Sequence, residues 1–447
     1  MVEQPIRNRQ VASSTLALGS TLFSFPRILD RIDPDLKKNA GREVARPIAE
    51  VFNPHFRQNK SHMFAGRTNW NLAENRLAQA LAEHRRSGRP LLDLTNSNPT
   101  ECGFAYAERA ILAAFQQSAS LKYEPAPQGI TLAREAVAHY YAQKGVSISI
   151  DDIFLTTSTS EAYSYLFRLL CNAGDEVLIP TPSYPLFDFL ADLNDVRLVR
   201  YPLVYDHGWQ TDFPSLQRAI SPRTRAVIAV HPNNPTGHYA KAREQSQLSD
   251  FCAEKNLALI ADEVFLDFQL QGTAGTSFAR ESRALTFVLS GISKICGMPQ
   301  MKASWIALIG PENLRREARN RLEVIADSYL SMNAPVQLAL PALLATRADF
   351  QKQLLSRVRA NLAVLDADLS AQKDCSRLEL EGGWNVILRV PATRSDDDLA
   401  LALLSEHGVL VHPGHFYDFS QDGYLVLSLI TKEETFRKGL QSLISLF

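Results

Sequence analysis

Seven short runs of apolar, largely β-branched residues recur between residues 150 and 310, and they constrain the fold of this chain more than any other feature. The runs are IFLTT, EVLIP, RLVRYPL, RAVIAVH, LALIA, TFVLS and SWIALI. Longer segments separate them, and several of these segments have a helical pattern. Strands that alternate with helices predict an α/β fold with a mainly parallel seven-stranded sheet covered by helices. Ligands of such a sheet bind at the carboxyl ends of its strands.

The two ends of the chain predict a second, smaller α+β domain. NLAENRLAQALAEHRRSG and GITLAREAVAHYYAQKG are typical of amphipathic helices, and helical segments followed by alternating strands and helices run from residue 310 to the C-terminus. We therefore expect residues 63–140 and 336–447 to form the small domain and residues 141–335 the large one. Residues 1–62 are expected to be a poorly ordered extension. A weak signal peptide, or an upstream start codon before Met63, is the alternative interpretation of this segment.

Charge and cysteine usage argue against several classes of partner. The chain has 447 residues and a net charge of −1, whereas nucleic acids and anionic membranes bind basic surfaces. Its apolar runs fall well short of the roughly 20 residues that a membrane-spanning helix needs. Its five cysteines form no CxxC pair, which fits free thiols in a reducing compartment. We expect a cytoplasmic protein without a metal site.

Five polar motifs follow the predicted strands. TTSTSEAYSYLF offers hydroxyls and a helix N-terminus to an anion such as phosphate, although Ser and Thr are also ordinary N-caps. Tyr184 in PTPSYPLFDF could lie against a planar ring or fill the core, and Asn234 in HPNNPTGHY could donate a hydrogen bond or form a turn. Asp262 ends an apolar strand, where a carboxylate needs a cationic partner. Lys294 in SGISK ends the sixth strand.

The order of these motifs resembles that of the class I/II aminotransferase family, pyridoxal-phosphate enzymes of the aspartate-aminotransferase-like fold type I. The resemblance runs from about residue 67 to residue 447. It implies the cofactor pyridoxal 5'-phosphate and an enzyme that moves an amino group between an amino acid or amine and a 2-oxo acid, through a Schiff base on Lys294. It also implies a homodimer whose partners are small molecules, with no nucleic acid and no membrane.

The resemblance also implies a role for each motif residue. Lys294 forms the Schiff base and moves the substrate's Cα proton, and Asp262 keeps the ring nitrogen protonated. Asn234 approaches the 3-oxygen of the ring, and Tyr184 stacks on its face. The phosphate group is expected to be bound by several further residues, namely Ser158, Thr159, Ser160, Ser293, Lys302 (in place of an arginine) and, across the dimer interface, Tyr123.

Three positions depart from the family pattern. Phe265 replaces a tyrosine that usually hydrogen-bonds the 3-oxygen, and Gly291 replaces a serine that often contacts the phosphate. Val426 replaces the arginine that binds the substrate carboxylate, so either another cation binds this group or the substrate lacks it. The residues expected to bind substrate, each of which could instead be structural, are Ser97, Trp384, Asn385 and His415, with Arg389 and His412 nearby in sequence.

Other functions remain open at this point. A pyridoxal-phosphate lyase, decarboxylase or related biosynthetic enzyme uses the same residues, and the missing arginine makes it more plausible. A ligand-sensing regulator of the same fold would need a DNA-binding module, but residues 1–62 contain no convincing helix-turn-helix pattern. A nicotinamide-binding Rossmann enzyme is disfavoured because no G-x-G-x-x-G motif follows a predicted strand.

Overall fold

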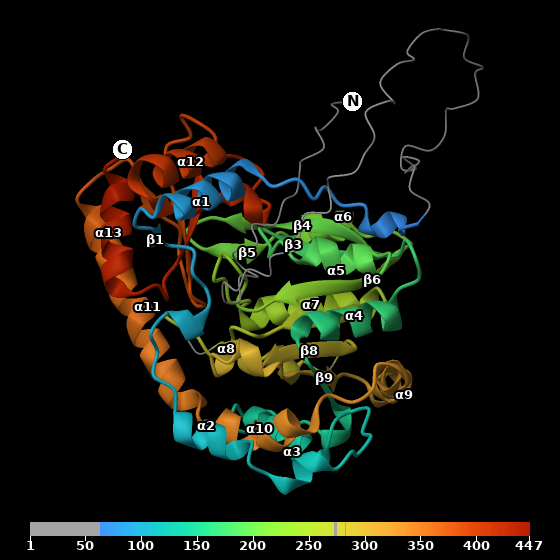
Figure 1. Ribbon diagram of the computed structural model, residues 1–447. Coiled ribbons are helices and arrows are strands. Elements are labelled where there is room, and N and C mark those ends of the chain that lie inside the picture. The colour runs from blue at the N-terminus through green and yellow to red at the C-terminus, as the bar shows by residue number, and fades with distance from the viewer. Residues whose placement is uncertain (1–62, 272–274, 282) are drawn as a thin grey trace, which may run out of the picture.

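The computed structural model describes residues 63–447 except 272–274 and 282. The predicted extension over residues 1–62 lies outside the described residues. Figure 1 shows a large lobe built around a central sheet and a smaller lobe that contains the first and the last described α-helices, α1 (Arg76–Ser87) and α13 (Glu433–Ile444). Segments from near both ends of the described chain therefore meet in the small lobe, whereas η3 (Gly66–Thr68) at its start packs against α5 (Phe187–Leu193) of the large lobe.

The large sheet has eight strands and is mostly parallel. In sheet order they are β2 (Ile153–Thr156), β9 (Ser304–Ile309), β8 (Thr286–Gly291), β7 (Ala258–Asp262), β6 (Thr224–Val230), β3 (Glu176–Thr181), β4 (Arg197–Tyr205) and β5 (Trp209–Thr211). Neighbours from β8 to β4 are parallel, whereas β9 runs antiparallel to β2 and β8, and β5 antiparallel to β4. The predicted α/β fold and its seven strands are confirmed. The short hairpin strand β5 was not predicted.

The central strands are apolar along their whole length because both faces of the sheet are covered. All five residues of β7 are buried. Leu259 and Ala261 face one hydrophobic core, and Ile260 between them faces the other. The first core is covered mainly by α3 (Thr131–Ala142), α6 (Phe213–Arg218), α7 (Ala242–Glu254) and α10 (Ala334–Ala345). The second is covered by α4 (Thr159–Leu170), α5 (Phe187–Leu193) and α9 (Glu312–Ser328).

The small lobe has its own core and two small sheets. An antiparallel sheet joins β10 (Ser376–Arg377), β11 (Asn385–Arg389), β14 (Tyr424–Ser428) and β13 (His412–Pro413), and β1 (Leu92–Asp93) pairs in parallel with β12 (Val409–Leu410). Its core lies among α1, α11 (Arg347–Ser370), α12 (Asp396–His407), α13 and these strands. The α1 helix is bounded by its sequence, since Asn75 caps its first turn and Gly88 ends it at a φ of 70°.

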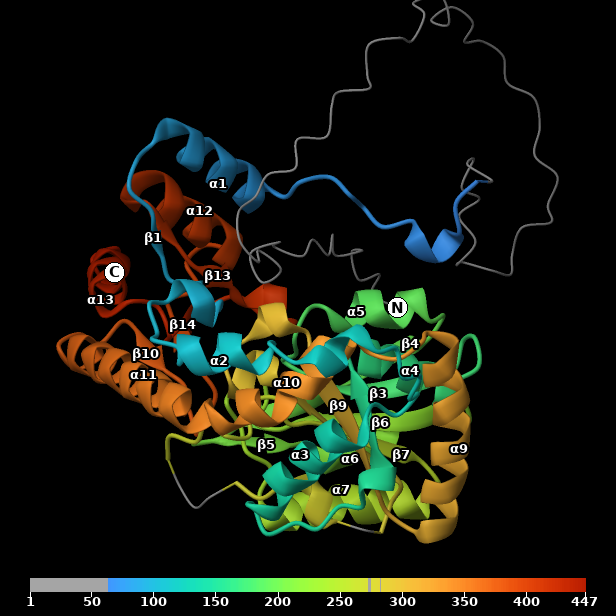
Figure 2. The same ribbon diagram turned by 60° about the horizontal axis from the view of Figure 1, so that its bottom comes forward.

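The hydrophobic cores do not follow the predicted boundaries of the two domains in every segment. The division into two domains itself stays a prediction. Residues of α2 (Glu108–Ala114), α3 and α10 belong to the core of the large sheet, although residues 63–140 and the segment after residue 336 were expected to form the small domain. Figure 2 shows α3 and α10 together in front of the sheet, with α9 along its side.

Short helical turns complete the described chain. They are α8 (Ile292–Ile295) and the 3₁₀ helices η3 (Gly66–Thr68), η4 (Pro99–Glu101), η5 (Ser118–Leu121), η6 (Ile150–Asp152), η7 (Phe278–Arg280), η8 (Pro299–Met301) and η9 (Gly414–Tyr417). Within the part of the chain that the structure describes, no helix has both the length and the apolar character needed to cross a membrane.

Candidate active site

A cavity of about 170 Å³ lies where several strands of the large sheet end. Its walls come from the segments that follow β2, β3, β6, β7 and β8, from the first residue of β9, and from the small lobe. Because β9 is antiparallel to its neighbours, its amino end meets the carboxyl ends of the parallel strands at this edge. The predicted residues Lys294, Asp262, Asn234 and Tyr184 all line the cavity.

Lys294 lies on α8, three residues after the last residue of β8. Burial lowers the pKa of its ammonium to about 8, against the attraction of the Asp262 carboxylate. Its Nζ lies 5.0 Å from the ring centre of Trp384 and 5.6 Å from that of Phe265. At Gly291, a Cβ would fall 2.2 Å from the Ser304 hydroxyl. The turn that presents the lysine therefore requires glycine.

Asp262 ends β7 with only 7% of its surface exposed. Burial raises the pKa of its carboxyl to about 6, against hydrogen bonds that favour the charged form. The Val264 amide donates one of them to Oδ1 over 3.2 Å, and the buried Tyr163 hydroxyl donates the other to Oδ2 over 3.0 Å. Tyr163 also lines the cavity but was missed from the sequence. The sequence feature that could have indicated this role is the position of Tyr163 in the first turns of the helix that follows β2.

The small lobe supplies one wall of the cavity. Trp384, Asn385 and Ser97, the residues that the sequence suggests for substrate binding, line this wall. The Asn385 side-chain Nδ2 donates to the Asn234 side-chain Oδ1 over 2.7 Å, which connects the two lobes across the cavity. Phe265 also lines the cavity, and its ring meets that of Trp384 edge-on at 4.8 Å.

Hydroxyl groups gather at the N-terminus of α4. Thr159 and Ser160 line the cavity there, and Ser293 lines it from α8. The positive end of the α4 helix adds backbone N–H groups. Ser158 does not line the cavity, because its hydroxyl caps α4 by accepting from the Glu161 amide over 3.1 Å. Tyr184, held in the apolar surroundings that raise the pKa of its phenol to about 12, lines the same cavity.

Besides Ser158, three predicted residues of the described chain lie outside the cavity. Lys302 is exposed at a φ of 53°, and Tyr123 is 72% exposed. His415 faces Asp397 instead, with 3.6 Å between Nε2 and Oδ1. His412 is buried, and its Nδ1 lies 3.1 Å from the hydroxyl of Tyr417, which does line the cavity.

The cavity is poor in positive charge. Among the described residues that line it, Lys294 is the one Lys, Arg or His. Val426 is 1% exposed in β14, where it packs with Ile387 and Tyr417. Arg389 lines a separate cleft beside Trp209. No group of three His, Cys, Asp or Glu side chains within the described segments could hold a metal ion.

Sequence comparison matches the chain to aminotransferases. The family model Aminotransferase class I and II matches residues 90–443. The glutamate-pyruvate aminotransferase AlaA of Haemophilus influenzae is 27% identical over 255 residues, which are 57% of this chain and 63% of that protein. An alanine aminotransferase of Mycobacterium bovis is 29% identical over 366 residues, 80% of this chain and 79% of that protein.

Solved structures extend the likeness to the fold. An alanine aminotransferase from Pyrococcus furiosus matches with a TM-score of 0.78 at 22% identity, covering 86% of this chain and 99% of that one. An aspartate aminotransferase variant from Thermus thermophilus matches with a TM-score of 0.75 at 24% identity, covering 86% of this chain and 99% of that one.

Proposed function

The chain belongs to the family of class I and II aminotransferases, and from this membership we propose that it moves an amino group between an amino acid or amine and a 2-oxo acid. The observation that carries the proposal is the meeting of Lys294 and Asp262 in one cavity, at the ends of the adjacent parallel strands β8 and β7. A lysine of lowered pKa beside a buried carboxylate is a typical catalytic arrangement.

The cavity fits pyridoxal 5'-phosphate, the cofactor that this family uses. A cavity of about 150 Å³ in a protein core accommodates benzene, so this one, at about 170 Å³, has room for a six-membered ring. Lys294 would hold the aldehyde end, Asp262 the ring nitrogen and Asn234 the 3-oxygen. Tyr184 and Phe265 would bound the ring, and the hydroxyls at the start of α4 would hold the phosphate.

The proposed chemistry assigns a task to each ionisable group. When bound, pyridoxal phosphate supplies an aldehyde that reacts with amines and a ring that draws electrons from the substrate carbon. With a pKa of about 8, Lys294 is partly neutral near neutral pH, so its Nζ can act as a nucleophile and can accept and return the substrate's Cα proton. Tyr163 and the Val264 amide help to keep Asp262 charged and fix its orientation.

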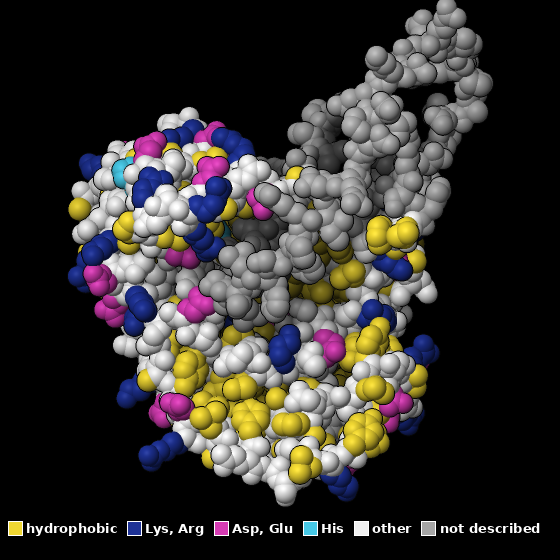
Figure 3. Space-filling view, viewed as in Figure 1, with side chains coloured by type: hydrophobic (Ala, Val, Ile, Leu, Met, Phe, Trp, Pro, Cys, Tyr) yellow, Lys and Arg dark blue, Asp and Glu magenta, His cyan; other side chains and the backbone are white. Residues whose placement is uncertain are grey.

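Three residues predicted to bind the phosphate do not line the cavity. Ser158 can still donate its hydroxyl hydrogen to a phosphate, because it uses only its oxygen in the cap. We propose that Lys302 adds positive charge to the phosphate site in a homodimer, and that Tyr123 reaches it from the neighbouring subunit. Exposed apolar side chains near Tyr123 support a homodimer, and Figure 3 shows hydrophobic side chains gathered over α2, α3 and α10.

The substrate end of the cavity recognises its ligand mainly through uncharged groups. Ser97 and Asn385 offer hydrogen bonds, and Trp384 offers an aromatic surface. A carboxylate buried there would lack a strong cationic partner in the described chain, which is costly. His415 is the candidate cation proposed for it from the sequence, provided that it leaves Asp397. An amine without a carboxylate therefore belongs among the proposed donors.

The five cysteines are all free, which supports the proposal of a cytoplasmic location.

The test is a half-reaction with the cofactor-loaded protein and matched amino donors. Phenylalanine and phenethylamine differ only in the carboxylate, as do alanine and ethylamine. Transamination leaves the amino group on the protein-bound cofactor, with a lasting change in its absorbance that a 2-oxo acid reverses. A lyase or decarboxylase returns to its starting spectrum unaided, and this result would favour the alternative function.

Lys294→Ala is the decisive variant. It should abolish turnover of every donor and the covalent labelling of the chain by cofactor and borohydride. Lys432→Ala is a matched control, because this lysine is exposed at the start of α13 and does not line the cavity. Label on a peptide that lacks residue 294 would contradict the proposal.

A further inference from the structure

One segment of the small lobe crosses to the large lobe beside the cavity. We name residues 380–385 the strap, and residues 231–239, which follow β6, the Asn234 loop. The strap ends in the cavity wall with Trp384 and Asn385. Its backbone touches the loop directly, since the Gly382 amide donates to the Gly237 carbonyl over 3.1 Å. A Cβ on Gly237 would fall 2.5 Å from the Gly382 oxygen, so no side chain fits between them.

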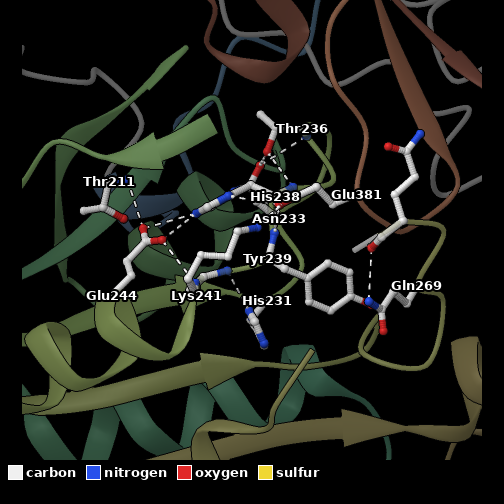
Figure 4. A network of polar contacts seen from close by, with 12 residues as sticks. Thr211, His231, Asn233, Thr236, His238, Tyr239, Lys241, Glu244, Gln269 and Glu381 are labelled. Atoms are coloured by element: carbon white, nitrogen blue, oxygen red, sulfur yellow. Dashed lines mark hydrogen bonds and ion pairs between the residues drawn. The ribbon is translucent and has the colours of Figure 1, made fainter. Parts of the chain in front are cut away.

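The other end of the strap is anchored by a cluster of charges around His238. Figure 4 shows this cluster, in which Glu244 and Glu381 lie beside the His238 ring. Its Nε2 is 3.0 Å from Glu244 Oε2, and its Nδ1 is 3.5 Å from Glu381 Oε2. Glu381 also binds the Lys241 ammonium and accepts from the Tyr239 amide over 3.0 Å. One carboxylate of the strap therefore meets three groups of the large lobe.

The contacts within the cluster favour its charged form. Burial opposes a charge on His238, which is only 4% exposed, but its contacts with Glu244 and Glu381 outweigh this and raise its pKa. Burial likewise opposes the charge on Glu381, but the nearby His238 ring and hydrogen bonds from Lys241 and the Tyr239 amide lower its pKa to about 2. Two cations and two carboxylates then balance, and removing any buried member leaves a charge without a partner.

The strap needs such an anchor because two glycines follow Glu381. Gly382 and Gly383 have no side chains to pack, and Gly383 adopts a φ of 78°. Glycine loses more conformational freedom on folding than any other residue. The position of Trp384, whose ring centre lies 5.0 Å from Lys294 Nζ, therefore depends on contacts on both sides of the glycine pair. Asn385 is fixed by Asn234 on one side, and Glu381 by the charge cluster on the other.

We propose that Glu381 is a positioning residue, which binds His238, Lys241 and the Tyr239 amide and thereby holds Trp384 and Asn385 in the cavity wall that receives the amino substrate. This inference rests on the proposed aminotransferase function for its kinetic part. Glu381 touches neither the cavity nor the reacting atoms. Glu381 acts on the cavity wall indirectly, by fixing the position of the strap.

The test is Glu381→Gln, which keeps the shape of the side chain and removes its charge. Hydrogen exchange of the cofactor-loaded protein should show faster exchange at the Gly382 and Gly383 amides, which donate to Gly237 and Phe268 in the wild-type chain. KM for the best amino donor should rise about tenfold, the order expected when a hydrogen bond to a charged group is lost. The absorbance of the bound cofactor should stay unchanged, and kcat should change far less than KM.

A matched control and a second variant make the outcome decisive. Glu317→Gln removes an exposed ion pair with Arg321 on α9 and should alter neither exchange nor KM. If Glu381→Gln does not fold, Lys241→Gln removes one partner whose side chain is 58% exposed, and it should act in the same direction but more weakly.

If hydrogen exchange at the strap is as slow in either folded variant as in the wild type, the inference is overturned. Faster exchange with an unchanged KM also overturns it, because the strap would then move without affecting substrate. If the wild-type protein transaminates no donor, the proposed function fails, whereas the exchange experiment still decides whether Glu381 fixes the strap.

Discussion

Replacing Tyr163 by Phe should destabilise the cofactor-free protein more at about pH 8 than at about pH 5. The Tyr163 hydroxyl donates to Asp262 Oδ2 over 3.0 Å, and both residues are buried. Phe keeps the ring, which meets Phe187 edge-on at 5.0 Å, and removes only the donor. The substitution therefore changes the free energy of the carboxylate rather than the packing of the core.

The magnitude follows from the difference between hydrogen bonds to charged and to neutral groups. A bond to an ionised group contributes about 1.5–3 kcal/mol and one to a neutral group about 0.5–1.5 kcal/mol. A difference of about 1.4 kcal/mol corresponds to one pKa unit. Burial already raises the pKa of Asp262 to about 6, and without Tyr163 it should rise to about 7.

The sign of the pH dependence follows from proton linkage. A carboxyl whose pKa is higher in the folded chain than in the unfolded chain stabilises the fold at low pH, and this stability is lost as pH rises through the folded pKa. At about pH 5 the carboxyl is mostly protonated in both proteins, so the variant loses a neutral hydrogen bond. At about pH 8 it is mostly ionised in both, and the variant should lose about 1.4 kcal/mol more.

Urea unfolding at both pH values measures the free energies of unfolding. Tyr201→Phe is a suitable control, because the buried Tyr201 hydroxyl donates to the neutral Ile228 carbonyl over 2.7 Å, and its loss should cost the same at both pH values. An equal cost for Tyr163→Phe at the two pH values would refute the reasoning.

Two further predictions concern groups near the cavity. Burial raises the pKa of the Glu263 carboxyl to about 8, so the free energy of unfolding of the wild type should fall as pH rises from 6 to 9. The Glu263→Gln variant lacks this ionisation and should lose less stability over the same range. An equal change in the unfolding free energies of the two proteins would contradict this. Phe265→Tyr adds a phenol hydroxyl to the cavity wall, which by family resemblance reaches the 3-oxygen of the cofactor. An absorbance titration should show the yellow form of the loaded protein converting at a lower pH, and an unmoved transition would count against this role for position 265.

The residues at strand ends could be placed from the sequence because a parallel sheet brings the ends of distant strands together. Asp262, Asn234 and Lys294 each follow a recognisable apolar run, so their meeting in one cavity required only the strand pattern. The side chains that act on them were harder to predict. Tyr163 and Asp262 are 99 residues apart, and no local pattern indicates that a tyrosine on a helix points toward a particular carboxylate.

Local chemistry explains the residues that lie elsewhere than expected. The Ser158 hydroxyl caps α4, which a Ser/Thr cluster at a helix start allows equally well. Lys302 sits in a left-handed turn and is exposed, and His415 faces Asp397. The contact between His238 and Glu381 joins residues from different lobes, so it depends on how the lobes pack, and the periodicity of the sequence contains no information on that.

The strand order of the large sheet has a consequence for the synthesis of this chain. β2 ends at residue 156, and among the described strands it pairs with β9 alone, which begins at residue 304. While the ribosome makes the intervening segment, β2 and the outer side of β8 present unpaired backbone groups, which are templates for association with other chains. We therefore expect the nascent protein to need shielding until β9 emerges and fills the gap between them, and its yield in a cell to depend on chaperone supply and translation speed.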